Sequence, residues 1–287
     1  MDFLKVIILG IIEGITEFLP ISSTGHLILA SDFISLTPKE FENAFEVIIQ
    51  LGAILSVLVI YFDTLNPFSK NKMSKQLVEN QSRLTISQKW FLRDKKTMRL
   101  IAKIIVGFLP AAVLGFLFDD LIDKYLFNKV TVSLALVFYG AVIILMENRG
   151  KKIKFKYEKL DSITIKTAFF IGVFQCLAMV PGTSRSAATI IGAMILGCSR
   201  TAAAEFSFFL AIPTMLGATS LKILKMGIGF SLHQWILILV GGLVSFLVAY
   251  AVIIKFMGYI KKHDFKIFGI YRIILGAVVL ISMLIFK

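Results

Sequence analysis

One polar stretch near the N-terminus, residues 13–26, constrains the chain most, because nearly everything around it is apolar. It reads Glu-Gly-Ile-Thr-Glu-Phe-Leu-Pro-Ile-Ser-Ser-Thr-Gly-His. An ionisable side chain at membrane depth costs at least ~2.5–3.5 kcal/mol, so such groups indicate a functional site. A second polar stretch, residues 181–189, reads Pro-Gly-Thr-Ser-Arg-Ser-Ala-Ala-Thr and interrupts the second half in the same way. We expect the two stretches to meet and to form one anion-binding site.

The composition indicates a polytopic α-helical membrane protein. The chain is 57% hydrophobic, with a mean hydropathy of +0.84 and several apolar runs near 20 residues. These runs are continuous rather than alternating, which argues against a β-barrel. The net charge of +13 does not indicate a nucleic-acid partner, because the basic residues cluster between apolar runs, where orientation signals belong. Cys176 and Cys198 lie in apolar segments, so we expect neither a disulfide nor a cysteine metal site.

Two pairs of short apolar arms surround the polar stretches. Residues 3–18 and 25–36 flank Pro20, and residues 167–180 and 187–198 flank Pro181 and Gly182. Each arm is too short to cross ~30 Å of hydrocarbon at 1.5 Å per residue. Each pair therefore predicts a re-entrant helical hairpin whose tip lies inside the membrane, buried in protein or lining a wet cavity.

Six longer apolar runs predict transmembrane helices, at residues 43–61, 99–118, 130–146, 202–221, 233–256 and 268–286. The acidic residues 119–123 are expected to form a turn. The chain thus reads as one integral membrane domain with two copies of a hairpin plus three spans, in halves 1–147 and 166–287 joined by a basic cytoplasmic loop. Pro20 parallels Pro181, and Glu46 parallels Glu205. Three spans per half give the halves inverted topology, with the polar site at their interface.

The loop charges predict the orientation. Loops near 62–99, 147–166 and 255–272 carry 21 Lys and Arg residues, whereas the opposite side carries seven. By the positive-inside rule the 21-charge side is cytoplasmic, so both termini face outward.

The second polar stretch has the chemistry of an anion site. It opens a short helix, whose free N–H groups and positive end favour an anion. Ser184, Ser186 and Thr189 add hydroxyl groups, and the planar fork of Arg185 suits a phosphate. The alternative is that the hydroxyls only cap the helix and Arg185 pairs with a buried carboxylate.

The first polar stretch adds carboxylates and a nucleophile. Glu13 and Glu17 stand four residues apart, so they share a helix face. They could hold Mg²⁺ or Ca²⁺, or one could act as a general base. A serine beside His26 is a minimal activated nucleophile. The alternatives are a hydrogen-bonded core histidine and glutamates that only neutralise Arg185. Together the two stretches predict hydrolysis or transport of a phosphate ester in the membrane, and periodicity does not separate these.

Residues 13–26 and 181–189 resemble the paired signatures of the undecaprenyl-diphosphate phosphatases, the bacitracin-resistance family. Residues 45–54 and 205–213 resemble two further family segments, so the resemblance covers essentially the whole chain. It implies a multi-pass enzyme of the bacterial cytoplasmic (inner) membrane that removes the terminal phosphate of undecaprenyl diphosphate and recycles the lipid carrier for cell-wall synthesis. It also implies a divalent cation, Mg²⁺ or Ca²⁺, and a site open toward the outer face.

The resemblance implies roles for individual residues. Glu13 and Glu17 match the acidic pair, the expected metal ligands. The expected catalytic residues are Glu17, Ser23, His26 and Arg185, with Ser23 as the nucleophile. The expected phosphate-binding residues are Ser22, Thr24, Gly182, Thr183, Ser184, Ser186 and Thr189.

Several alternatives stay open at this stage. Ser23 attacks phosphorus while His26 or Glu17 takes its proton, or water attacks with Glu17 as base. The competing function is a flippase of the lipid phosphate; the Ser/His/Glu cluster favours an enzyme, since a carrier needs no base. A homodimer is a further expectation: Gly115, Gly140, Gly241 and Gly242 permit close helix packing, either within one bundle or between two chains.

Overall fold

A computed structural model describes the chain except for residues 32, 70–93, 127, 151–154, 227–228 and 286–287. The basic loops predicted at 62–97 and 147–166 therefore lie partly outside the described residues. The described part is predominantly helical and contains no β-strand, only an isolated bridge between Tyr157 and Cys198. Both of its cysteines are free thiols.

Six helices are long and apolar enough to cross a membrane, which confirms the predicted all-α, six-span fold class. They are α3 (Lys39–Ile60), α7 (Lys95–Leu126), α8 (Lys129–Gly150), α11 (Arg200–Met226), α12 (Leu232–Ile260) and α13 (Lys266–Ile285). The shorter elements are α1 (Asp2–Thr16), α2 (Ser23–Ala30), α4 (Phe62–Leu65), η3 (Leu160–Ser162), α9 (Ile165–Gln175), η4 (Cys176–Met179) and α10 (Arg185–Ile195).

The acidic segment 119–123, expected to be a turn, instead continues α7 to Leu126. The expectation was wrong because this segment contains charges but no proline or glycine, and charge alone does not end a helix. Helix α7 ends at Leu126, and α8 begins at Lys129. There the side chain of Asn128 accepts a hydrogen bond from the Thr131 amide, 2.9 Å away, and caps α8.

The short helices pack against different long helices in each half. Helix α1 packs along α12, and α9 packs along α7. Helix α12 also contacts α3, and α7 contacts α11, while α3 pairs with α11 and α8 pairs with α13. Exchanging the two predicted halves interchanges the pairs α1–α12 and α9–α7, and likewise α12–α3 and α7–α11, while α3–α11 and α8–α13 each map onto themselves. The inverted repeat stays a prediction, and this pattern of contacts agrees with it.

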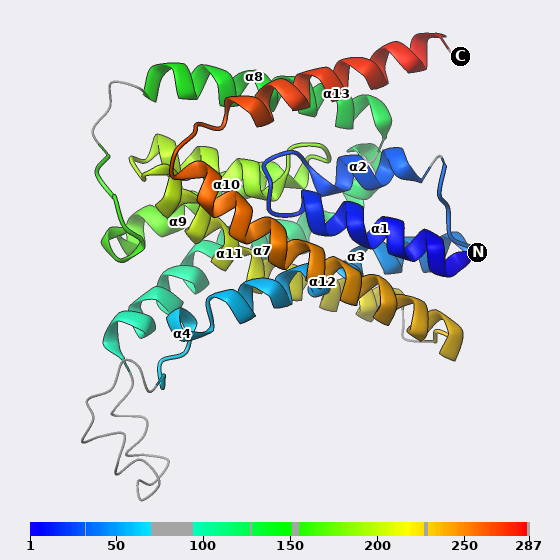
Figure 1. Cartoon of the computed structure of the whole chain (residues 1–287), viewed down its shortest axis with the longest axis horizontal. Helices are drawn as coiled ribbons and strands as arrows, with labels where there is room; N and C mark the ends of the chain where they lie inside the picture. Colours follow the sequence, from blue (N-terminus) through cyan, green and yellow to red (C-terminus); the bar gives the residue numbers. More distant parts are fainter. Residues whose placement is uncertain (32, 70–93, 127, 151–154, 227–228, 286–287) are drawn as a thin grey trace, which may run out of the picture.

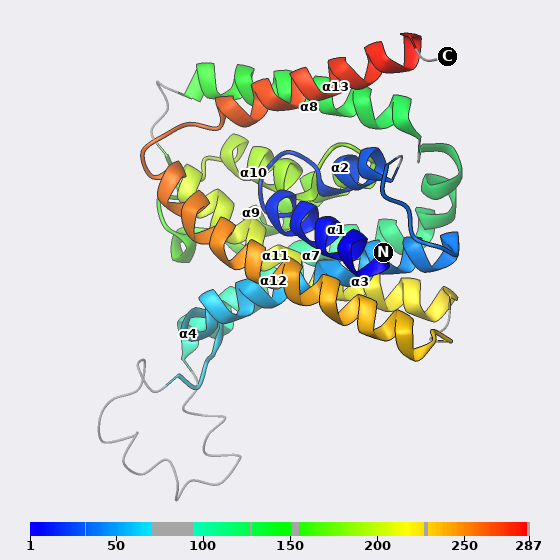
Figure 2. The same cartoon turned by 45° about the vertical axis from the view of Figure 1, so that its right-hand side comes forward.

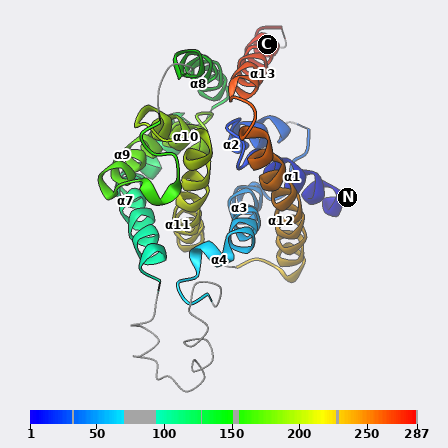
Figure 3. The same ribbon diagram turned by 60° about the vertical axis from the view of Figure 1, so that its left-hand side comes forward.

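The views show how this packing arranges the molecule. Helices α8 and α13 lie together as a layer along one side of the bundle, in all three orientations (Figures 1 and 2). Figure 3 shows α7, α9, α10 and α11 on one side and α1, α2, α3 and α12 on the other. Both chain ends lie at one end of the bundle, and α4 lies at the opposite end (Figure 1).

Glycines bring several of these helices into backbone contact. A Cβ on Gly140 of α8 would lie 2.7 Å from the carbonyl oxygen of Gly269 on α13. One on Gly52 of α3 would lie 2.1 Å from the carbonyl oxygen of Gly242 on α12, and one on Gly241 would collide with an aromatic ring of α3. The close approach that these glycines permit is therefore used within the chain.

Candidate functional site

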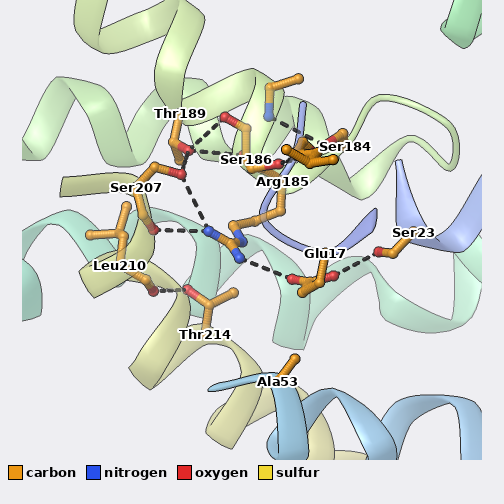
Figure 4. Close-up of polar contacts among 12 residues, drawn as sticks. Glu17, Ser23, Ala53, Ser184, Arg185, Ser186, Thr189, Ser207, Leu210 and Thr214 are labelled. Carbon is orange, nitrogen blue, oxygen red and sulfur yellow. Dashed lines mark hydrogen bonds and ion pairs between the residues drawn. The ribbon is translucent and has the colours of Figure 1, made fainter. Parts of the chain in front are cut away.

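The two polar stretches meet at the centre of the bundle (Figure 4). Arg185, at the start of α10, places its Nη2 2.9 Å from Oε1 of Glu17, just after α1. The Ser186 hydroxyl donates to the carbonyl oxygen of Leu19, 2.9 Å away. A side-chain ion pair and a hydrogen bond to the backbone thus join the tips of two segments more than 160 residues apart.

Both tips use the same local device to begin their second helix. Ser22 and Ser184 have positive φ angles of 75° and 73°, a region that non-glycine residues enter at a cost of about 1–3 kcal/mol. Each is an N-cap: Ser22 Oγ accepts from the Gly25 amide and Ser184 Oγ from the Ala187 amide. The cap offsets part of the strain. Consequently the free amides at the starts of α2 and α10 lie at the meeting point of the tips.

Glu17 connects the predicted nucleophile to the predicted phosphate ligand. The Ser23 hydroxyl donates to Glu17 Oε2 at 2.6 Å, while Glu17 Oε1 receives Arg185. The carboxyl group is 4% exposed, so water does not screen either contact. A hydroxyl bonded to a carboxylate has the geometry of a nucleophile with its base.

Arg185 is held from its other side by a residue that the sequence did not single out. Its Nη1 donates to the Ser207 carbonyl oxygen at 2.8 Å, and the Thr189 hydroxyl donates to Ser207 Oγ at 2.7 Å (Figure 4). Ser207 lies in α11, within the family-like segment 205–213, and the available signal was a hydroxyl in an apolar span. Thr189 therefore supports Arg185 through Ser207.

A cavity of about 400 Å³ opens beside these groups. Its polar wall contains seven of the predicted site residues: Glu17, Ser22, Ser23, Thr24, Gly182, Ser184 and Arg185. Two glutamines, Gln50 of α3 and Gln175 of α9, complete that wall. The rest is mainly apolar, and it includes Gly115 and Phe116 of α7 and Leu221 of α11. A charged headgroup fits the first part and a hydrocarbon chain fits the second.

Five predicted site residues lie behind this wall: Glu13, His26, Thr183, Ser186 and Thr189. Thr183 and Thr189 are fully buried. Gly182 is held against α8, where an added Cβ would lie 2.5 Å from the Val132 carbonyl oxygen, and its φ of 91° also requires glycine. The tip of the second hairpin thus combines residues that face the cavity with residues that fix its shape.

His26 points away from Ser23. Its Nδ1 lies 2.7 Å from the Ser22 carbonyl oxygen, and its Nε2 lies 2.6 Å from the Tyr271 hydroxyl of α13. A carbonyl oxygen only accepts, so Nδ1 carries the proton and Nε2 of the neutral ring accepts from Tyr271. In this arrangement the Ser23 hydroxyl is hydrogen-bonded to Glu17 and not to the imidazole.

Glu13 is fully buried, and neither of its oxygens has a hydrogen-bond donor among the described side chains. Glu13 stands four residues before Glu17, so the two carboxyl groups lie on the same side of the end of α1. A buried carboxylate is stable only when it is paired, protonated or bound to a metal. The two unpartnered oxygens of Glu13, next to the Glu17 carboxylate, fit a divalent cation, although no cluster of three acidic, histidine or cysteine ligands occurs in the described part.

Arg272 is the second functional-site residue that sequence reasoning missed. The loop charges that predict the orientation include this arginine, but it lies within α13 and its side chain is completely buried. Its guanidinium donates to the Pro20 carbonyl oxygen at 3.1 Å and to the Gly182 carbonyl oxygen at 2.8 Å. It therefore bonds to the backbone of both tips. The only signal in the sequence was an arginine followed by an apolar run.

Two of the buried polar atoms without partners, the hydroxyls of Ser133 and Ser245, lie in α8 and α12, and the others divide by hydrogen-bonding role. Around the second tip they can donate, namely Gln175 Nε2, Thr183 Oγ1 and Arg185 Nε. At α1 they are the two acceptor oxygens of Glu13. Because buried polar groups are nearly always bonded, unpaired donors favour an anionic ligand and unpaired carboxylate oxygens favour a cation. The site is therefore suited to a phosphate group accompanied by a proton or a metal ion.

Comparisons with known proteins agree with this chemistry. The family model described as "Bacitracin resistance protein BacA" matches residues 6–278. The chain is 51% identical to the Undecaprenyl-diphosphatase 1 of Clostridioides difficile (strain 630) over 98% of this chain and 96% of the relative. It is 48% identical to an Undecaprenyl-diphosphatase of Enterococcus faecalis (98% and 97% covered). It is 50% identical to that of Fusobacterium nucleatum subsp. nucleatum (97% and 99% covered). With a family model matched over nearly its whole length and full-length relatives near 50% identity, the chain belongs to the bacitracin resistance protein BacA family.

Proposed function

We propose that this protein is a membrane phosphatase that hydrolyses undecaprenyl diphosphate to undecaprenyl phosphate and inorganic phosphate. The observation that carries the proposal is the bonded series Ser23–Glu17–Arg185 on the wall of a cavity whose remaining lining is mainly apolar. The names of the full-length relatives support the same substrate. Recycling of the lipid carrier for cell-wall synthesis, and the resistance to bacitracin that the family name records, follow from this activity.

The diphosphate binds through the second tip in this proposal. The fork of Arg185 and the amides at the start of α10 bind its oxygens, and Ser184, Ser22 and Thr24 add donors at the cavity wall. Binding of an anion draws Arg185 partly away from Glu17. Glu17 then becomes a stronger base at the moment when the substrate is in place.

Ser23 Oγ attacks the terminal phosphorus while Glu17 takes the hydroxyl proton. The bond from that phosphorus to the bridging oxygen breaks, and undecaprenyl phosphate leaves. Water, deprotonated by a base, then hydrolyses the phosphoserine. The 2.6 Å contact between Ser23 and Glu17 supports this route. In the alternative route water attacks directly, Glu17 is the base and Ser23 only binds phosphate.

Glu13 and Glu17 would hold the divalent cation, Mg²⁺ or Ca²⁺, that the family resemblance implies. Such an ion would neutralise charge on the phosphate oxygens. The unpartnered oxygens of Glu13 support this assignment, since the protein itself supplies them with no donor in the described part.

The proposed site lies in the bacterial inner membrane and opens outward, with both termini outside. The cavity supports this direction, because it reaches Phe116 and Leu221, near the ends of α7 and α11 that the loop charges assign to the outer face. The undecaprenyl tail would follow the apolar wall toward the lipid. The homodimer remains a prediction; three of the four glycines that suggested it contact other helices of the same chain.

The decisive experiment measures phosphate release from undecaprenyl diphosphate by detergent-purified protein, with and without EDTA, for the wild type and Arg185→Ala. We expect metal-dependent release that Arg185→Ala reduces by about 10²-fold or more while the variant stays folded. Wild-type protein that releases no phosphate, yet moves undecaprenyl phosphate across liposome membranes, would overturn hydrolysis and favour the flippase.

A further inference from the structure

Helix α9 ends at Gln175, whose side-chain amide is buried. The corresponding position of the first hairpin carries a carboxylate. The predicted repeat aligns Gly172-Val-Phe-Gln175 with Gly10-Ile-Ile-Glu13. The two glycines also have matching contacts: a Cβ on Gly172 would lie 2.0 Å from the Gly107 carbonyl oxygen of α7, and one on Gly10 2.6 Å from that of Gly241 on α12. Glu13 and Gln175 thus occupy equivalent places, but one offers acceptors and the other offers donors.

The amide of Gln175 is an unsatisfied donor in the wall of the cavity. The residue is 2% exposed, and its Nε2 has no hydrogen-bond partner among the described residues. Its Oε1 lies 3.4 Å from the Thr214 hydroxyl, which is 2.7 Å from the Leu210 carbonyl oxygen. Because that hydroxyl has one proton and the shorter bond takes it, Thr214 holds the amide only weakly.

The surroundings of Gln175 favour an anion as its partner. It shares the cavity wall with Arg185 and Ser184, and the unpaired donors Arg185 Nε and Thr183 Oγ1 lie in the adjacent tip. An amide supplies N–H groups without charge, so it binds a phosphate oxygen while leaving the Glu17–Arg185 ion pair electrostatically undisturbed. Among the described residues its side-chain amide has only the long contact with Thr214, and a buried polar group costs free energy unless a partner pairs with it.

We propose that Gln175 is a substrate-binding residue whose Nε2 donates to a non-bridging oxygen of the diphosphate. This inference rests on the proposed phosphatase function and deepens it, because it adds a neutral donor to the charged ligands of the second tip. The contact is made with the diphosphate headgroup and not with the prenyl tail.

Two variants of Gln175 separate binding from packing. Gln175→Met keeps the side-chain volume and removes the donor. We expect its KM for undecaprenyl diphosphate to rise roughly 10-fold or more, which is the range for a lost hydrogen bond to a charged group. Its melting temperature should change little. Gln175→Glu replaces the donor by a carboxylate that repels phosphate. Its KM relative to the wild type should therefore be largest at high pH and should fall as acidification protonates the new carboxyl group and restores a donor.

Cys176→Ala is the matched control. Cys176 is the next residue, and its thiol bonds to the Gly172 carbonyl oxygen of α9 rather than lining the cavity. We expect its KM to stay within twofold of the wild type. A wild-type KM in Gln175→Met, or an equal rise in Cys176→Ala, would overturn the inference, since the first outcome removes the binding role and the second reduces it to local packing.

A binding measurement keeps this inference separable from the proposed function. Inorganic pyrophosphate with Mg²⁺ should raise the melting temperature of the wild type more than that of Gln175→Met. Absence of phosphate release by the wild type would overturn the phosphatase, and the pyrophosphate shift would still test Gln175. An equal shift in both proteins would overturn the donor role whether or not the wild type is active.

Discussion

At the scale of single residues, the site depends on which group faces the Ser23 hydroxyl. The structure places Glu17 there and turns His26 toward Tyr271. Both imidazole nitrogens are already bonded, so the ring supports the turn that follows Ser22 and has no free nitrogen for the serine proton. The catalytic role predicted for His26 from the Ser-x-x-His spacing stays a prediction, and the contacts observed here favour Glu17 as the base.

The first prediction compares these two candidates. Glu17→Gln should lower kcat by about 10²–10⁴-fold, the usual contribution of a general base. His26→Gln should lower kcat much less, because it removes only the bonds of the ring to Ser22 and Tyr271. Tyr271→Phe removes only the second of these bonds, so it should lower kcat no more than His26→Gln does, and the double variant should be no worse than His26→Gln. Phosphate-release kinetics on folded protein provide the measurement. If His26→Gln reduced kcat as much as Glu17→Gln, the imidazole would be the base.

At the scale of elements, the central feature is that two tips more than 160 residues apart in the sequence are bonded to one buried arginine. Arg272 donates to the carbonyl oxygens of Pro20 and Gly182. Helix α13 carries this side chain and pairs with α8, against which Gly182 is packed. The spacing between the tips, and with it the contact between Glu17 and Arg185, depends on this bridge.

The second prediction follows from that bridge. Arg272→Met leaves two buried carbonyl groups unpaired, at about 1–3 kcal/mol each. A displacement of the tips by ~1 Å would lower kcat about 10²-fold. Arg272→Lys should recover little, because a single ammonium group lacks the fork that spans both oxygens. Activity and melting temperature are measured together. A variant Arg272→Met that kept kcat within threefold would show that the tips hold their spacing without it.

The third prediction concerns the crossing of α3 and α12. A Cβ at Gly52 would lie 2.1 Å from the Gly242 carbonyl oxygen, so Gly52→Ala must separate two backbones and should lower the melting temperature by several degrees. Gly242→Ala is the control from the same crossing, because its Cβ would meet nothing within 4 Å. That change should be neutral or stabilising, since alanine is the better helix former by about 1 kcal/mol. An equal loss of melting temperature in both variants would contradict the close backbone contact between α3 and α12.

At the scale of the whole molecule, the paired contacts of the two halves and the position of the chain ends agree with one topology. Both chain ends lie at the same end of the bundle, and α4 lies at the far end (Figure 1). In the predicted inverted repeat the two hairpins enter the bundle from opposite membrane faces, and the ion pair between Glu17 and Arg185 joins their tips.

The fourth prediction tests this topology. In a background without the two native cysteines, a single cysteine at Gly229 should react with a membrane-impermeant maleimide in intact cells. One at Glu158 should react only after the membrane is opened. Both positions are exposed, so accessibility within the protein does not limit either reaction. Labelling of position 158 in intact cells would reverse the orientation that the positive-inside rule assigns.

The sequence by itself determined the class of the protein and the chemistry of its site. Continuous apolar runs near 20 residues specify membrane helices, because the bilayer thickness demands that length. Polar side chains that break such runs are costly there, so residues 13–26 and 181–189 were recognisable without any coordinates. The capping roles of Ser22 and Ser184 depend on neighbouring residues in the chain, so they too could be predicted from the sequence.

Only the tertiary structure decided which of those side chains touch. Ser207 and Arg272 joined the site because α11 and α13 pass beside the tips, and sequence distance carries no record of that contact. Helical rotation brought Glu17, rather than His26, to Ser23. The burial of Arg272 likewise depends on carbonyl groups contributed by two distant turns. A hydropathy value describes each residue by itself, whereas a buried charge acquires its hydrogen-bond partners only when the helices pack together.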